Sequence, residues 1–92
     1  MNQNAFALQP STDQESAGWQ ALSAALDAAS AYARIAAMTD IAETAQHNYR
    51  NAQGAHAIAK EAVSKTAAVP AYYLTQLSDI EAQLEVLETQ FA

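Results

Sequence analysis

Alanine fills 24 of the 92 positions of this chain, more than any other residue. It has the highest helix propensity of all residues, and its small side chain lets buried helices approach closely. Only two glycines and two prolines are present, too few for the turns of a β-sandwich or barrel. We therefore expect one small all-α domain, whose core rests on alanine contacts and on 23 larger apolar side chains.

Apolar residues recur at spacings of three and four in three segments, the pattern of a helix with one buried face. We expect helices over about residues 12–38, 40–67 and 70–91, packed as an antiparallel three-helix bundle. The predicted buried stripes are Trp19, Leu22, Leu26, Ala29, Ala33 and Ala36 in the first helix, Ala42, Ala45, Tyr49, Ala52, His56, Ala59, Val63 and Thr66 in the second, and Tyr73, Leu77, Ile80, Leu84, Leu87 and Phe91 in the third.

Small residues indicate where the helices come closest. Ala45, Ala52 and Ala59 repeat every seven residues along the second stripe, which favours a tight helix contact. Gly18 costs about 1 kcal/mol relative to alanine inside a helix. We therefore expect another backbone to lie against it, beside Trp19.

Local signals set the expected helix starts. Thr12 with Glu15, and Asp40 with Glu43, have the spacing of a capping box. Pro70 suits the first position of a helix because it lacks only a hydrogen-bond donor that this position does not use. The alternative is a set of long kinked helices packed in an oligomer, since no glycine ends the first helix and the apolar spacing continues through Pro70.

The ends and the charge limit the classes of function. Residues 1–11 are expected to form an extended arm, docked on the domain's own helices or on a neighbouring subunit. They show no signal-peptide pattern, and the longest uncharged stretch, 66–78, is shorter than the ~20 residues of a membrane span. We expect a cytoplasmic protein without membrane contact. If the protein is viral, we expect it in the host-cell cytoplasm or in the virion. The net charge of −6 argues against direct binding of nucleic acid.

The residues that carry chemistry are few and isolated. Without cysteine, a nucleophile motif or a glycine-rich phosphate loop, we expect no enzyme activity, no catalytic residue and no cofactor. Glu43 and His47 share a helix face but form no recognised metal motif, so we expect no metal site. His56 lies inside an apolar stripe, where we expect a neutral ring bonded to a hydroxyl or carbonyl; a pH-sensitive contact is the alternative.

Two surfaces are the candidates for protein interaction. Glu81, Glu85 and Glu88 share one flank of the third helix, two of them near its carboxyl end, where the helix dipole disfavours negative charge. Their position suggests a partner with a basic surface.

The second surface is apolar. Tyr32 and Ile35 broaden the apolar face of the first helix beyond what two neighbouring helices need, and Ile58 interrupts the polar side of the second. This surface favours a contact with another subunit or partner.

We therefore expect a non-enzymatic, acidic helical subunit for protein–protein interaction or assembly, which self-associates through alanine-rich heptad faces into a homo-oligomer. The alternative is a small acidic inhibitor, of the type phages direct against host defence, that blocks a basic nucleic-acid-binding surface of a target protein. Steep weakening of binding by salt is expected only for the inhibitor.

Overall fold

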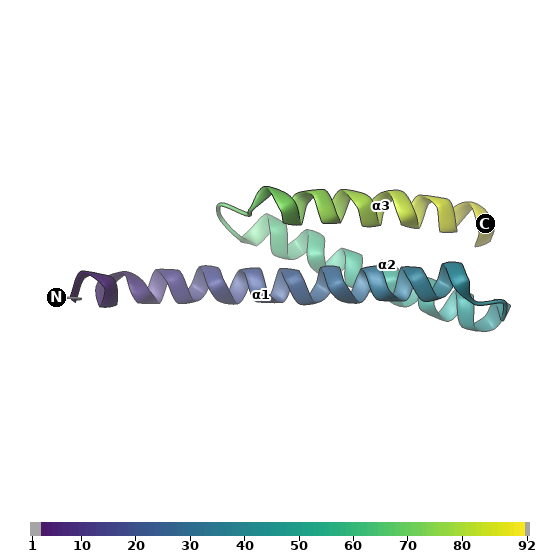
Figure 1. The fold of residues 1–92 in the computed structure, drawn as a ribbon, viewed down its shortest axis with the longest axis horizontal. Helices are drawn as coiled ribbons and strands as arrows, with labels where there is room; N and C mark the ends of the chain where they lie inside the picture. Colours follow the sequence, from purple (N-terminus) through teal and green to yellow (C-terminus); the bar gives the residue numbers. More distant parts are fainter. Residues whose placement is uncertain (1–2, 92) are drawn as a thin grey trace.

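The computed structural model describes the backbone of residues 3–91 and the side chains of residues 18–91. It contains three helices, α1 (Gln3–Met38), α2 (Ala42–Lys65) and α3 (Ala71–Phe91), with no strand in the described part. The helices form the expected three-helix bundle. Successive helices run in opposite directions, and the molecule measures 59 × 18 × 16 Å (Figure 1).

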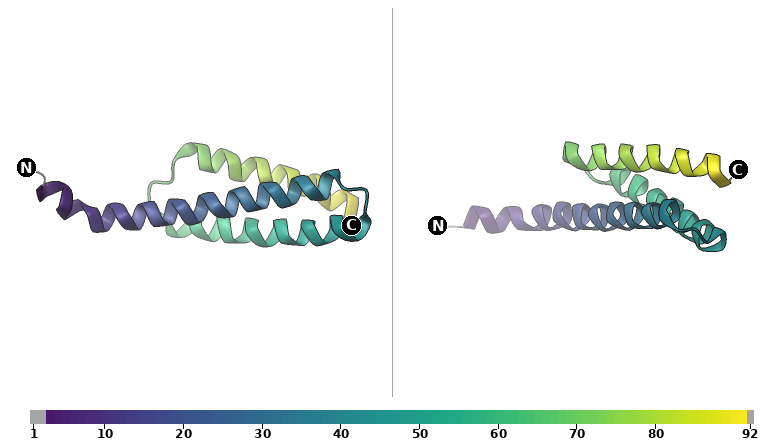
Figure 2. Two further views of the ribbon diagram at one scale, coloured as in Figure 1. Left: turned by 60° about the horizontal axis from the view of Figure 1, so that its bottom comes forward. Right: turned by 45° about the vertical axis from the view of Figure 1, so that its right-hand side comes forward.

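The start of α1 differs from the expectation. The helix begins at Gln3, so residues 3–11 are helical rather than an extended arm, and Thr12 lies inside the helix instead of capping it. Good helix formers such as Ala5 and Leu8 favour this extension, and Pro10 removes only one backbone hydrogen bond. The first turns bend away from the axis of α1 and project beyond the ends of α2 and α3 (Figures 1 and 2). We expected this segment to dock on the bundle or on a neighbouring subunit; its side chains lie outside the described residues.

The turn between α1 and α2 closes without the expected capping box. Ile41, not Asp40, is the residue before α2, and no side chain caps the helix. Instead the Thr39 hydroxyl accepts a hydrogen bond from the Ile41 backbone N–H at 3.3 Å. The extended conformation of Ile41 (φ −91°, ψ 111°) therefore sets the direction of α2.

The break between α2 and α3 is a full turn, so the alternative of continuous kinked helices is wrong. Ala68 adopts a left-handed conformation with φ 56°, and α3 starts at Ala71, one residue after Pro70. Proline lacks a backbone donor and disfavours a helical conformation for Val69, which stops α2 from continuing.

The core confirms the predicted stripes. The buried side chains of α1 and α2 are mostly alanines, and α1 adds two leucines. Helix α3 contributes three large apolar side chains. The buried apolar residues are Leu22, Ala25, Leu26, Ala29, Ala33, Ala36, Ala45, Ala52, Ala55, Ala59, Ile80, Leu84 and Leu87. Ala42 was expected inside but is exposed at the start of α2. Asn48, which the stripe did not include, is buried, and its side-chain amide donates to the Thr44 carbonyl at 2.9 Å.

Gly18 marks where the end of α2 meets α1. A Cβ built on Gly18 would lie 3.0 Å from Oγ1 and 3.3 Å from Cγ2 of Thr66. The close approach predicted from the sequence is present, but a side chain makes it rather than a backbone. The contact places the carboxyl end of α2 level with Gly18.

Candidate functional site

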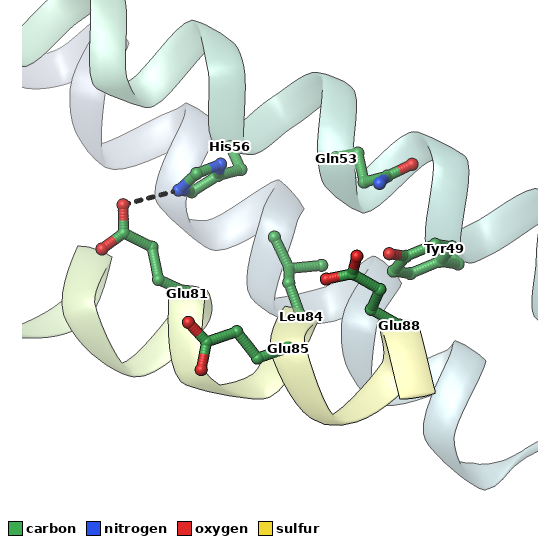
Figure 3. A pocket seen from close by; sticks show the side chains of 7 residues that line it. All are labelled: Tyr49, Gln53, His56, Glu81, Leu84, Glu85 and Glu88. Atoms are coloured by element: carbon green, nitrogen blue, oxygen red, sulfur yellow. Dashed lines mark hydrogen bonds and ion pairs between the residues drawn. The ribbon is translucent and has the colours of Figure 1, made fainter. Parts of the chain in front are cut away.

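The acidic flank, Glu81, Glu85 and Glu88, lies along a groove between α2 and α3 of about 380 Å³ (Figure 3). Tyr49, Gln53 and His56 of α2 line its other side. The structure therefore brings the three predicted carboxylates onto one wall of a shallow groove. Within residues 18–91, no lysine or arginine belongs to its lining.

His56 and Glu81 join the two walls of this groove. His56 Nε2 lies 2.9 Å from Glu81 Oε2, with the His56 side chain 19% exposed and that of Glu81 43% exposed. The expectation of a hydroxyl or carbonyl partner for His56 is therefore wrong, because the crossing of α3 presents a carboxylate at that point. A neutral imidazole can donate from Nε2 to the carboxylate, and a protonated one adds an ion pair.

The carboxylates do not converge as metal ligands. Among the described residues, no three histidine, aspartate or glutamate side chains gather closely enough to hold a metal ion. Glu85 and Glu88 are exposed along the groove, while Glu81 is turned to His56 (Figure 3). The flank therefore presents negative charge along an edge rather than around one point.

The apolar candidates lie on the other side of the molecule. α3 contacts one side of the α1–α2 pair only: Glu81 bonds His56 of α2, and the Gln76 amide donates to Asp27 of α1 at 3.4 Å. Ile58 follows His56 by two residues, which turns it about 160° around the helix axis. It is 60% exposed.

Tyr32 and Ile35 lie on the matching side of α1. Ser23 lines a hollow beside Tyr73 of α3, and Tyr32, nine residues later, points about 180° from it. Tyr32 is half-buried and Ile35 is 45% exposed. We call the side that carries Tyr32, Ile35 and Ile58 the uncovered face, because no helix of residues 3–91 lies over it.

The uncovered face is elongated. The turn after Met38 and the contact of Gly18 with Thr66 fix how α1 and α2 lie side by side. Tyr32 and Ile35 are thereby level with the middle of the first half of α2, whereas Ile58 lies more than two helical turns further along it. Within one chain, Tyr32, Ile35 and Ile58 therefore share one face, but Ile58 does not contact Tyr32 or Ile35.

The sequence pattern did not predict four exposed apolar side chains. Met38 and Ile41, 75% and 62% exposed, lie at the turn between α1 and α2, and Tyr72 and Leu74, 64% and 43% exposed, lie in the first turn of α3. Helical periodicity gives little information at helix ends, because a neighbouring helix need not extend that far. In the sequence, only their positions next to the predicted helix breaks indicate that these side chains are exposed.

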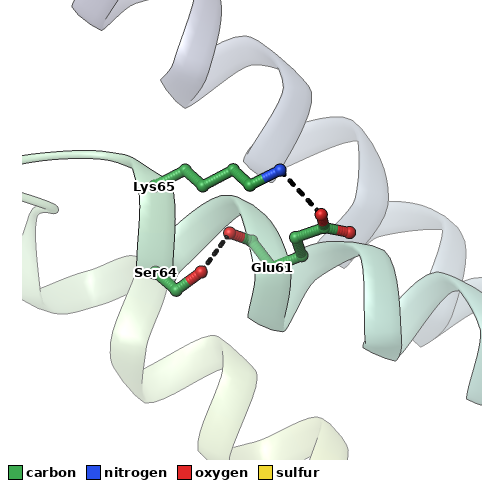
Figure 4. A network of polar contacts seen from close by, with 3 residues as sticks. All are labelled: Glu61, Ser64 and Lys65. Atoms are coloured by element: carbon green, nitrogen blue, oxygen red, sulfur yellow. Dashed lines mark hydrogen bonds and ion pairs between the residues drawn. The ribbon is translucent and has the colours of Figure 1, made fainter.

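One ion pair lies at the carboxyl end of α2. Lys65 Nζ donates to Glu61 Oε1 at 2.7 Å, and the Ser64 hydroxyl donates to the Glu61 carbonyl at 2.7 Å (Figure 4). The hydrogen bond and charge of Lys65 hold the pKa of Glu61 below its usual value, and Glu61 likewise raises the pKa of Lys65. Both side chains are largely exposed, so this ion pair contributes little to the stability of the fold.

A second hollow, of about 420 Å³, lies between α1 and α3 and is lined by Trp19, Gln20, Ser23, Ala24, Asp27 and Tyr73. Among the described side chains, residues 18–91, the buried Trp19 indole N–H has no hydrogen-bond partner. A buried donor without a partner costs about 1–3 kcal/mol.

Comparison with protein-family models, with curated proteins and with solved structures finds no match for this chain. Within residues 3–91, none of the helices has a stretch both long and apolar enough to cross a membrane. The acidic flank and the uncovered face are therefore the features of this chain that bear on its function.

Proposed function

We propose that this protein is a non-enzymatic helical interaction subunit that self-associates through the uncovered face. The observation that carries the proposal is the placement of α3, which covers one side of the α1–α2 pair and leaves Tyr32, Ile35 and Ile58 on the other. A homo-oligomer would remove this apolar surface from water.

The energetics favour an apolar contact. Burial of apolar surface contributes about 25 cal/mol per Å², which must exceed the entropy lost when two chains associate. Alanines beside the larger side chains allow a second helix to lie close to the face. Because apolar burial drives this contact, we expect most of the association to persist at high salt.

Substitution of one exposed isoleucine tests the proposal. Ile58→Ser is expected to shift the protein toward the monomer in sedimentation equilibrium at micromolar concentrations, because it removes apolar surface from the proposed contact. Val86→Ser is the matched control: Val86 is 59% exposed, against 60% for Ile58, but lies on α3. Equal association of the two variants would contradict the role of the uncovered face.

The acidic flank supports a second candidate function, binding of a basic protein surface, as an inhibitor of a nucleic-acid-binding protein would do. Glu85 and Glu88 are exposed beside the α2–α3 groove, and the chain carries a net charge of −6. Carboxylates along a groove can stand where phosphates would lie on a basic target.

A lysine-rich peptide is the probe for this candidate. NMR titration is expected to shift the backbone signals of Gln53, Glu85 and Glu88, with affinity that falls steeply as salt rises. Glu85→Gln with Glu88→Gln removes the charge but keeps the bond between Glu81 and His56. Unchanged affinity of this variant for the peptide would exclude the acidic flank as the binding surface.

A further inference from the structure

Gly54 lies in the middle of α2, and the fold of the single chain gives no reason for a glycine there. A Cβ at Gly18 would press on Thr66, but a Cβ at Gly54 would meet nothing within 4 Å. Glycine inside a helix is less favourable than alanine, because it loses more backbone entropy on folding. Such a glycine is typical of a position where another backbone passes close by.

Gly54 is the centre of a stripe along the exposed face of α2. Its residues are separated by three or four positions and therefore share one side of the helix. All are exposed, and we call them the Gly54 stripe: Glu43, His47, Arg50, Gly54, Ile58, Glu61 and Lys65.

We propose that a second copy of this chain binds the Gly54 stripe with its own α2, antiparallel and with the two-fold axis at Gly54. This inference rests on the self-association proposed above and specifies its geometry. In an antiparallel pair, residues equally far from Gly54 on either side lie opposite each other. Without a side chain at the centre, the two helix axes can come closer than the usual 8–10 Å.

The charges along the stripe suit this arrangement. Glu43 lies opposite the partner's Lys65, eleven positions from Gly54, and His47 lies opposite the partner's Glu61, seven positions from it. The ion pair of Lys65 with Glu61, 2.7 Å long in the single chain, gains the partner's Glu43 as a second carboxylate. A parallel pair would instead set Glu43 beside Glu43 and Lys65 beside Lys65, which is unfavourable.

The same arrangement brings the apolar residues Tyr32 and Ile35 of one chain near Ile58 of the other. The partner's Ile58 lies opposite Arg50, four positions from Gly54 on the other side. Tyr32 and Ile35 of α1 are level with this part of α2, because of the turn after α1 and the contact of Gly18 with Thr66. The partner's Ile58 therefore reaches the uncovered face beside Tyr32 and Ile35, which the single chain's own Ile58 does not.

The first test fills the space at the two-fold axis. Gly54→Leu is expected to keep the helical circular dichroism of the chain, since nothing surrounds the added side chain, and to raise the dimer dissociation constant at least about tenfold. Gln46→Leu, at an exposed position of α2 outside the stripe, is the control and is expected to leave dissociation unchanged.

Charge reversal tests the direction of the helices. Glu43→Lys and Lys65→Glu are each expected to weaken the dimer, because each places like charges together, and the double variant is expected to restore it. Sedimentation equilibrium of the full chain at low salt measures all three.

The outcomes separate this inference from the proposed function. A dimer that tolerates Gly54→Leu, or charge reversals that do not rescue each other, would overturn the antiparallel arrangement and leave self-association standing. A wild-type chain that stays monomeric would overturn both.

Discussion

The two glycines of this chain show opposite environments at the scale of a single residue. Gly18 is enclosed by Thr66, whereas the position of a side chain at Gly54 is open. Both glycines stand alone in helical sequence, and only the packing of α2 on α1 distinguishes them. The structure thus gives a packing reason for Gly18, whereas the reason proposed for Gly54 is the contact with a second chain.

Alanine substitution measures this difference. We expect Gly54→Ala to raise the free energy of unfolding by about 1 kcal/mol, the gain in helix propensity. Gly18→Ala is expected to gain less or to lose stability, because its Cβ would lie 3.0 Å from Thr66 Oγ1. Urea denaturation followed by Trp19 fluorescence, at concentrations below self-association, checks both. Equal gains would mean that Thr66 does not press on Gly18.

The bond between His56 and Glu81 makes a second prediction at this scale. A double-mutant cycle with His56→Gln and Glu81→Gln is expected to give a coupling of about 0.5 kcal/mol, since both side chains are partly exposed. Additive effects of the two substitutions would show that the contact does not hold α3 on α2.

At the scale of the helix, apolar spacing predicted the core well because burial follows the period of the helix itself. The buried positions Leu26, Ala52 and Leu84 were all identified in this way. The start of α1 was not, because the capping-box spacing of Thr12 and Glu15 also occurs inside helices. A cap requires a break in the backbone before it, and no residue between Gln3 and Thr12 makes one.

The alanine contact between α1 and α2 makes the prediction at this scale. We expect Ala52→Leu to lower the free energy of unfolding by about 1–3 kcal/mol, because Ala52 is fully buried and a larger side chain forces the helices apart. Thermal or urea denaturation measures the effect. Ala57→Leu, at an exposed position of α2, is the control. Unchanged stability of Ala52→Leu would place Ala52 outside a tight contact.

At the scale of the whole molecule, the helix contacts create features that no single helix contains. The acidic flank was predicted as three glutamates on one side of a helix, but its position opposite His56 depends on how α3 lies on α2. Helical periodicity fixes which side of a helix is buried and not how far one helix is shifted along another. For the same reason, Tyr32, Ile35 and Ile58 were predicted as apolar surplus, while their common face depends on the side that α3 leaves open.

Association of identical chains through the uncovered face would raise the molar mass in solution as the concentration rises. Light scattering of the wild-type chain at rising micromolar concentration is expected to show a mass that increases from that of the 9.8 kDa monomer toward at least twice that value. A mass that stays at 9.8 kDa up to the highest soluble concentration would contradict the account.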